Sequence, residues 1–168
     1  EERVLFFADG SVNPEPDAEA LAEIAKLGAD TAEWFGFQPV VAFLSYANFG
    51  SVRRGSPARV ARAVEIAHQR WPGLSLEGEM QADLALDPTR RSRLPFAEIA
   101  GAANVLVFPN LDAAHIAVRM MDAIGNATVV GPILMGMRNP VNSLQATATI
   151  ADIVNLTAIT VLQAQKEY

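Results

Sequence analysis

Short apolar runs along the chain predict its strands. Mainly apolar runs fall at residues 3–8, 40–45, 103–108 and 128–130, and an alternating run falls at residues 75–80. Runs of this length bounded by Gly, Pro, Asn or Asp are typical of strands. The alternating run places Glu77 and Glu79 on one side, which predicts a half-exposed or edge strand whose glutamates face water.

Apolar residues at helical spacing predict four helices between and after these strands. They span about residues 17–35, 57–71, 112–124 and 150–165, and residues 83–94 form a charged connection. The helix at 112–124 is apolar almost all round, so we expect it to be buried. The last helix carries Asp152 as its only charge and needs an apolar partner in this subunit or another. The order predicts an α/β fold, with a mostly parallel sheet covered by helices on both faces.

Composition narrows the range of partners. The 168 residues suit one domain, and 51% hydrophobic against 19% charged residues indicate a globular, rather apolar protein with subunit contacts. A net charge of −6 argues against nucleic acid or an anionic membrane as the main partner. The chain has no cysteine and no apolar run of about 18 residues, so we expect neither disulfides nor a transmembrane helix. A cytoplasmic location fits these features.

Loops rich in Gly, amide and hydroxyl groups follow the predicted strands. They are residues 9–13, 45–51, 109–112 and 131–142. Loops at the carboxyl ends of parallel strands meet at one edge of the sheet, where ligands bind. Their chemistry suits a phosphorylated or carbonyl ligand held by hydrogen bonds. Turns enrich the same residue types, so a ligand cleft and ordinary loops both remain open.

Asp152 has two interpretations. Thr149 and Asp152 have the spacing of a capping box, in which the threonine caps the helix and the acid reaches back to it. Alternatively, Asp152 is a general base that faces a cleft.

Two further groups of residues invite a metal-site interpretation. His68 and His115 lack partners at ligand spacing, so we interpret them as packing or solvent residues. Glu77, Glu79 and Asp83 are compatible with a metal cluster, but alternation along a strand favours an exposed polar face. We therefore expect no metal site.

Five blocks in this chain resemble phosphotransacetylases. They are LSYANFGS (44–51), EGEMQADLAL (77–86), ANVLVFPNLDAAHI (103–116), GPILMGMRNPVN (131–142) and ADIVNLTAITVLQAQ (151–165). More closely, they resemble the phosphotransacetylase-like C-terminal domain of bacterial multidomain NADP-dependent malic enzymes, within the phosphate acetyl/butyryltransferase family. The resemblance implies a two-lobed fold like that of isocitrate and isopropylmalate dehydrogenases, with the ligand in the cleft. Residues 1–130 would be the second lobe, and residues 131–168 would return toward the first. The chain begins at Glu1 with a strand close behind, which favours excision from a larger protein.

The chain departs from this family where the chemistry is expected. The Ser-Arg pair of active members aligns with Gln145 and Ala146, and a lysine aligns with Asn139. A Thr-Lys pair aligns with Asn48-Phe49. Neutral side chains cannot supply the cation needed beside a phosphate or a forming thiolate. Of the side chains that active members carry at these places, only Asp152 is retained. Because the cationic side chains are missing, we expect no catalytic residue in this chain.

The resemblance implies a regulatory and oligomerisation domain of an NADP-dependent malic enzyme, which converts malate to pyruvate and CO2. Acetyl-CoA or a related acyl-CoA would be the allosteric effector, and the domain would form a dimer, or a higher homo-oligomer in the full-length protein. NADP and Mg or Mn would bind to malic-enzyme domains elsewhere in the same chain. The alternatives are part of an active phosphate acetyltransferase and a structural dimerisation module without ligand. The acyl-CoA cleft would be lined by Ser45, Asn48, Ser51, Pro109, Asn110, Gly131, Gly136, Asn139 and Asn142.

Overall fold

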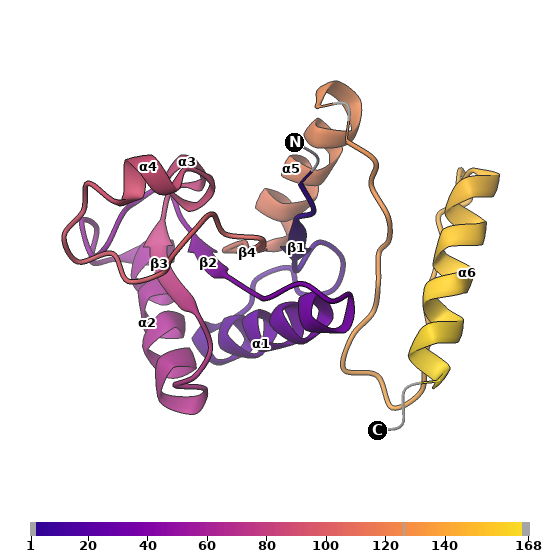
Figure 1. The fold of residues 1–168 in the computed structure, drawn as a ribbon, viewed down its shortest axis with the longest axis horizontal. Helices are drawn as coiled ribbons and strands as arrows, with labels where there is room; N and C mark the ends of the chain where they lie inside the picture. The colour runs from indigo at the N-terminus through magenta and orange to yellow at the C-terminus, as the bar shows by residue number, and fades with distance from the viewer. Residues whose placement is uncertain (1–2, 126, 166–168) are drawn as a thin grey trace. The chain divides into compact units, whose positions relative to one another are not determined.

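The computed structural model describes residues 3–125 and 127–165 and contains a four-stranded parallel sheet in the order β1-β4-β2-β3 (Figure 1). The strands are β1 Phe6–Ala8, β2 Val41–Leu44, β3 Leu76–Met80 and β4 Val105–Val107. The helices are α1 Ala18–Trp34, α2 Gly55–Arg70, α3 Ala82–Leu86, α4 Pro88–Arg91, α5 Leu111–Ile124 and α6 Ile150–Gln165. The predicted α/β fold with a parallel sheet is confirmed.

The chain divides into two compact units, Glu1–Ala117 and Val118–Tyr168, which we call the sheet unit and the C-terminal unit. The boundary falls within α5. The division into lobes near residue 130 concerns a two-lobed parent protein and stays a prediction.

Alternating residues of the central strands build a hydrophobic core on each face of the sheet. Val41 and Phe43 of β2 join the cluster formed with α1 and α2. Ala42 and Leu44 join the other cluster, which includes Ala85 of α3 and residues from the start of α5. This alternation is what a strand covered on both faces requires.

Gly28 brings α1 close to the sheet. A Cβ atom at this position would lie 2.9 Å from Val105 Cγ1 and 3.3 Å from Ala8 Cβ. The helix begins at Asp17, whose carboxylate accepts a hydrogen bond from Ala20 N at 2.8 Å. The absence of a side chain at Gly28 therefore allows α1 to lie in close contact with β1 and β4.

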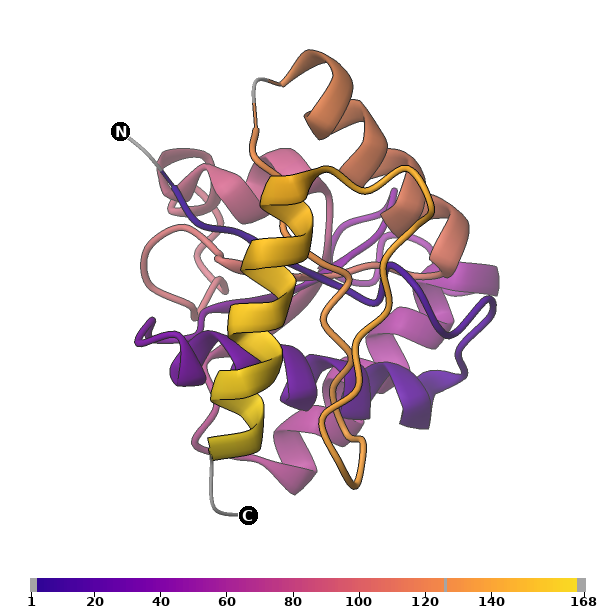
Figure 2. The same cartoon turned by 90° about the vertical axis from the view of Figure 1, so that its right-hand side faces the viewer.

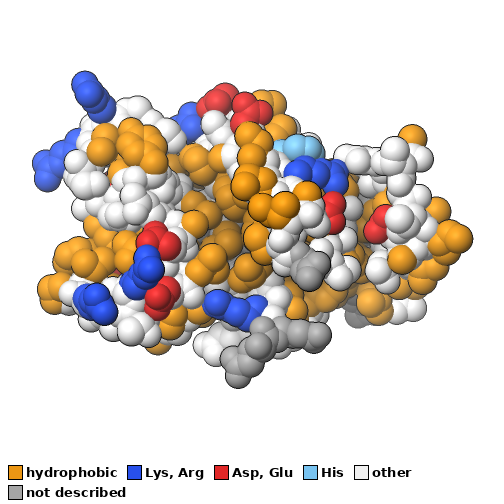
Figure 3. Space-filling view, turned by 90° about the horizontal axis from the view of Figure 1, so that it is seen from above, with side chains coloured by type: hydrophobic (Ala, Val, Ile, Leu, Met, Phe, Trp, Pro, Cys, Tyr) orange, Lys and Arg blue, Asp and Glu red, His pale blue; other side chains and the backbone are white. Residues whose placement is uncertain are grey.

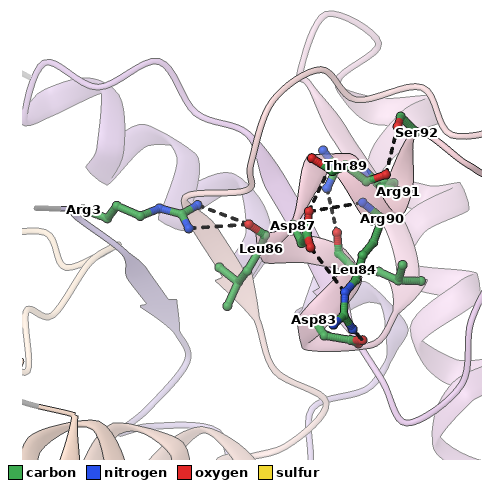
Figure 4. A network of polar contacts seen from close by, with 9 residues as sticks. All are labelled: Arg3, Asp83, Leu84, Leu86, Asp87, Thr89, Arg90, Arg91 and Ser92. Atoms are coloured by element: carbon green, nitrogen blue, oxygen red, sulfur yellow. Dashed lines mark hydrogen bonds and ion pairs between the residues drawn. The ribbon is translucent and has the colours of Figure 1, made fainter. Parts of the chain in front are cut away.

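The charged connection forms the short helices α3 and α4 (Figure 4). Asp87 caps α4 by accepting hydrogen bonds from Thr89 N and Arg90 N, and Arg90 also pairs with Asp83 at 2.8 Å. Arg91 is buried, with only 2% of its surface exposed. Its guanidinium donates to the carbonyl oxygens of Leu84, Ala85, Ile99 and Gly101. One side chain thus fixes a segment with little regular structure of its own.

The expectation that the glutamates of β3 face water is wrong. The strand is at an edge of the sheet as predicted, but Glu77 and Glu79 are buried, with 7% and 1% of their surfaces exposed. The neighbouring loops fold over them, and Glu77 Oε2 lies 4.0 Å from Arg91 Nε. Alternation along the sequence could not reveal these covering loops.

The strand expected at residues 128–130 does not form, although the structure describes this segment. Val130 is 44% exposed, and the next residues are Gly131 and Pro132. Proline has no N–H to donate to a ladder, which limits any extension of this short run.

The expected burial of α5 is also wrong. Of its residues only Ala114 is buried, whereas Ile116, Met120 and Ile124 are mostly exposed. An apolar sequence shows that a helix can be buried, but not that a partner surface exists within the same chain.

In the C-terminal unit, two extended stretches run beside α6 (Figure 2). Asn142 joins them: its Oδ1 accepts from Leu134 N at 2.8 Å, and its Nδ2 donates to Thr160 Oγ1 and Gln163 Oε1 at 2.8 and 2.7 Å. The helix buries only Leu156, Ile159 and Gln163. Hydrophobic side chains are visible on its surface at the right of Figure 3. In the described part of the chain, no helix combines the length and apolarity needed to cross a membrane.

Candidate functional site

The carboxyl edge of the sheet collects three of the four candidate loops. The loops at residues 9–13, 109–112 and 45–51 follow β1, β4 and β2, which are parallel neighbours in the sheet. Asp9 organises the first loop, because its carboxylate accepts from the backbone N–H groups of Ser11, Val12 and Asn13 at 2.7, 3.0 and 2.8 Å. The predicted gathering of these loops at one edge is therefore confirmed.

The loop at residues 45–51 is shaped by its own candidate ligand residues. Ser45 Oγ accepts from Ala47 N at 3.2 Å, and Ser51 Oγ accepts from Asn48 N at 3.1 Å. Asn48 Oδ1 accepts from the backbone N of Gln81 at 2.8 Å, which ties the loop to the end of β3. Ser51 is exposed and Ser45 and Asn48 are half-buried, so all three side chains lie where a ligand can reach the loop.

Pro109 and Asn110 belong to a polar cluster at the same edge. Pro109 O accepts from Arg59 Nη2 at 2.9 Å, and Arg59 Nη1 pairs with Glu15 Oε2 at 3.1 Å. Asn110 Oδ1 accepts from Ala113 N at 3.0 Å in the first turn of α5, while its Nδ2 donates to Glu15 Oε1 at 3.3 Å. The sequence analysis missed Glu15 and Arg59, which stand 44 positions apart and carry no motif.

The other candidate residues lie in the C-terminal unit. Gly131 and Gly136 have positive φ angles of 132° and 75°, which suit glycine at the turns of this segment. Asn139 is exposed, whereas the amide of Asn142 makes the three hydrogen bonds described above. A binding role for these four residues stays a prediction.

Charge is scarce in this part of the chain. Arg138 is the only Lys or Arg among residues 127–165 of the sequence, and its side chain is exposed. Gln145 and Ala146 are exposed as well. Both side chains are neutral, so neither residue can supply a cation to a phosphate or a thiolate bound beside it.

Asp152 is held in the helix cap that its spacing with Thr149 predicts. Its Oδ2 accepts from both Thr149 N and Thr149 Oγ1 at 2.8 Å, and Thr149 Oγ1 accepts from Asp152 N at 3.2 Å. The backbone and side-chain hydrogen bonds from Thr149 lower the pKa of Asp152. The capping interpretation is confirmed, and a carboxylate with a lowered pKa is a weaker base.

No described residues form a group of three or more His, Asp or Glu side chains suited to a metal ion. His68 and His115 are both exposed on helices, in agreement with the solvent interpretation. The expectations about NADP, magnesium and manganese concern other domains and stay predictions.

Comparison with known families and proteins gives matches along nearly the whole chain. The family described as Phosphate acetyl/butaryl transferase matches residues 1–161. The phosphate acetyltransferase of Nitratidesulfovibrio vulgaris is 44% identical over 99% of this chain, which spans 24% of that protein. The NADP-dependent malic enzyme of Escherichia coli is 43% identical over 96% of this chain, which spans 22% of that protein.

A solved structure gives the same result. EutD phosphotransacetylase from Staphylococcus aureus superposes with a TM-score of 0.90 at 37% identity, covering 98% of this chain and 51% of that one. The chain thus spans from about a fifth to a half of the relatives it matches. The sheet order, the carboxyl-edge loops and these likenesses together place it in the phosphate acetyl/butyryl transferase family.

Proposed function

We propose that the chain is a non-catalytic, acyl-CoA-binding and oligomerising part of an NADP-dependent malic enzyme, and that it regulates the conversion of malate to pyruvate and CO2. The observation that carries this proposal is the state of Asp152. Its carboxylate is engaged by Thr149 and its pKa is lowered, whereas a general base works best with a pKa near the working pH. The relative from E. coli named above provides a precedent for such a chain within a malic enzyme.

The shortage of cations supports binding without turnover. Acyl transfer between phosphate and a thiol builds negative charge that must be stabilised as it forms. Arg138 is the only basic residue among residues 127–165, and Gln145 and Ala146 occupy the positions expected to carry the Ser-Arg pair. Loss of one such stabilising group typically costs about 10²–10³ in rate.

A bound acyl-CoA can still act on the rest of the protein. Three loops remain gathered at the carboxyl edge of the sheet, with hydroxyl and amide groups on the loop at residues 45–51. A ligand shifts an assembly by its different affinities for the two states, and this needs no chemistry at the binding site.

Calorimetry with acetyl-CoA and the full-length protein tests the proposal. We expect binding, and a fall in the rate of malate decarboxylation as acetyl-CoA is added. Ser51→Ala should weaken binding, whereas Ser92→Ala, an exposed serine of the α4 region, is the matched control and should not. Absence of acetyl-CoA binding by the wild-type protein would refute the proposal.

The second candidate is an active phosphate acetyltransferase, favoured by the 44% identity to such enzymes from N. vulgaris and Corynebacterium glutamicum. The deciding assay measures thioester formation from acetyl phosphate and coenzyme A by the full-length protein. Clear turnover would replace the regulatory proposal with the enzymatic one.

A further inference from the structure

The edge strand β3 carries two buried carboxylates for which the proposed function gives no role. Carboxylates are rarely buried unless donors satisfy them. Glu77 Oε1 accepts from Glu98 N, and Glu79 Oε1 accepts from Gly50 N, each at 2.7 Å. The two side chains therefore hold different segments: Glu77 holds the connection at residues 92–101, and Glu79 holds the loop at residues 45–51.

The loop at residues 45–51 is attached to the end of β3 along its length. Glu79 contributes twice, because its backbone O also accepts from Phe49 N at 2.8 Å. The remaining hydrogen bonds, each of 2.8 Å, join Ser45 N to Met80 O, Gln81 N to Asn48 Oδ1, and Gln81 Nε2 to Tyr46 O. Among these contacts only the Glu79 carboxylate supplies a charged acceptor, and charge-assisted hydrogen bonds are the stronger kind.

The conformation of the loop explains why a strong contact is placed at Gly50. Phe49 and Gly50 have φ angles of 46° and 79°, so two consecutive residues adopt the left-handed region. Phenylalanine is uncommon there and must be held by its surroundings. The hydrogen bonds from Phe49 N and Gly50 N to Glu79 hold both residues, and the Phe49 ring packs edge-on against Phe96 with centroids 5.0 Å apart.

We infer that Glu79 is a positioning residue whose buried carboxylate fixes the loop at residues 45–51 in the conformation that presents Ser45, Asn48 and Ser51 at the carboxyl edge. The ligand in this inference, an acyl-CoA, rests on the function proposed above. The effect on the loop itself does not depend on any ligand.

The test compares variants of the full-length protein by amide hydrogen exchange and by acetyl-CoA calorimetry. Glu79→Met removes the acceptor and keeps most of the volume. We expect exchange in residues 45–51 to rise and acetyl-CoA affinity to fall, each on the order of tenfold, as for loss of a hydrogen bond to a charged group. Glu79→Gln keeps an amide oxygen for Gly50 N and should restore both quantities toward the wild-type values.

Glu77→Met is the matched control, because it changes the same residue type on the same strand at similar burial. We expect it to raise exchange in residues 92–101 and to leave residues 45–51 and acetyl-CoA affinity unchanged. If Glu79→Met fails to fold, Glu79→Gln takes its place: it exchanges the carboxylate acceptor of Gly50 N for a neutral amide oxygen and should raise exchange in the same loop by a smaller factor.

Wild-type exchange in residues 45–51 of Glu79→Met, or of Glu79→Gln where that variant replaces it, would overturn the inference. An equal rise in that loop in Glu77→Met would also overturn it, since the effect would then be general. A wild-type protein that binds no acetyl-CoA would refute the proposed function instead, and the exchange data would still decide the role of Glu79.

Discussion

The sheet unit buries charged groups, whereas the C-terminal unit exposes apolar ones. In the sheet unit, Glu77, Glu79 and Arg91 are enclosed together with donors or acceptors for their charges. In the C-terminal unit, Ile150 and Val154 of α6 are 82% and 59% exposed. An exposed apolar face on a helix marks a contact surface. Among the buried side-chain N and O atoms of the described residues, only Arg59 Nε and Glu77 Oε2 have no hydrogen-bond partner, and Glu77 Oε2 lies 4.0 Å from Arg91 Nε. The sheet unit thus supplies most of the partners for its own buried polar groups, while α6 presents a face suited to a further apolar surface.

Two helices show the same difference. α1 buries eight residues, including Leu21 and Ile24, against the sheet and α2. α6 is of similar length and higher apolar content, yet it buries three. Hydrophobicity alone therefore does not determine burial; the presence of a complementary surface does.

The largest effect should come from removing a buried charge in the sheet unit. Arg91→Ala leaves four carbonyl oxygens without their donor and Glu77 without its nearby cation. We expect a loss of about 3–5 kcal/mol in the free energy of unfolding. Arg90→Ala is the control, because its ion pairs with Asp83 and Asp87 are exposed and should contribute about 0–1 kcal/mol. Urea denaturation measures the free energy of unfolding of both variants. An equal loss in the two variants would contradict the role of Arg91 as a buried donor.

The next effect compares aliphatic side chains of the two units. Leu21→Ala empties a site in the core and should cost about 2–5 kcal/mol. Val154→Ala on the open face of α6 should cost less than about 0.5 kcal/mol if nothing covers it. A much larger cost for Val154→Ala in the full-length protein would break the comparison, since it would mean that another surface covers α6.

A smaller effect should follow from adding a methyl group beneath α1. Gly28→Ala places a Cβ atom against Val105 and Ala8, so we expect a loss of about 1–3 kcal/mol from overpacking. Gly10→Ala is the control, because a Cβ atom there meets nothing within 4 Å. Thermal denaturation of the two variants gives the comparison, and a neutral Gly28→Ala would show that α1 can move away from the sheet.

The smallest effect concerns the cap of α6. The pKa of Asp152 is lowered in the folded chain, so its stabilising contribution is present above the ordinary pKa of an aspartate and is lost as the pH falls through the lower folded value. Amide exchange in α6 should therefore quicken on acidification. Asp152→Asn should reduce this pH dependence, whereas Asn155→Asp, one turn later, should retain it. An identical acid response in Asp152→Asn would exclude the cap as its cause.

Local patterns predicted most of the elements. Local spacing predicted the bounds of α6 and the capping box of Thr149 and Asp152, because both depend on residues within a few positions of one another. The gathering of the carboxyl-edge loops followed from the parallel order of the strands. These features could be predicted because local spacing and strand direction determine them.

The remaining features depend on partners that are distant in the sequence. Glu79 meets Gly50 29 positions away, and Arg59 meets Pro109 50 positions away. Neither pair has a motif, so the burial of Glu79 and the role of Arg59 could not be predicted. The exposure of α5 was missed for a related reason, since its apolar pattern does not reveal whether a complementary surface exists in this chain.

The two glutamates of β3 have a consequence for the assembly of chains. An edge strand offers unpaired backbone groups on which a strand of another molecule can add, and inward-pointing charges oppose such pairing. Glu77 and Glu79 are buried charges on this edge strand, and each accepts a hydrogen bond from a backbone N–H of a neighbouring segment. The two glutamates that hold the neighbouring loops are therefore also of the kind that disfavours strand pairing at this edge.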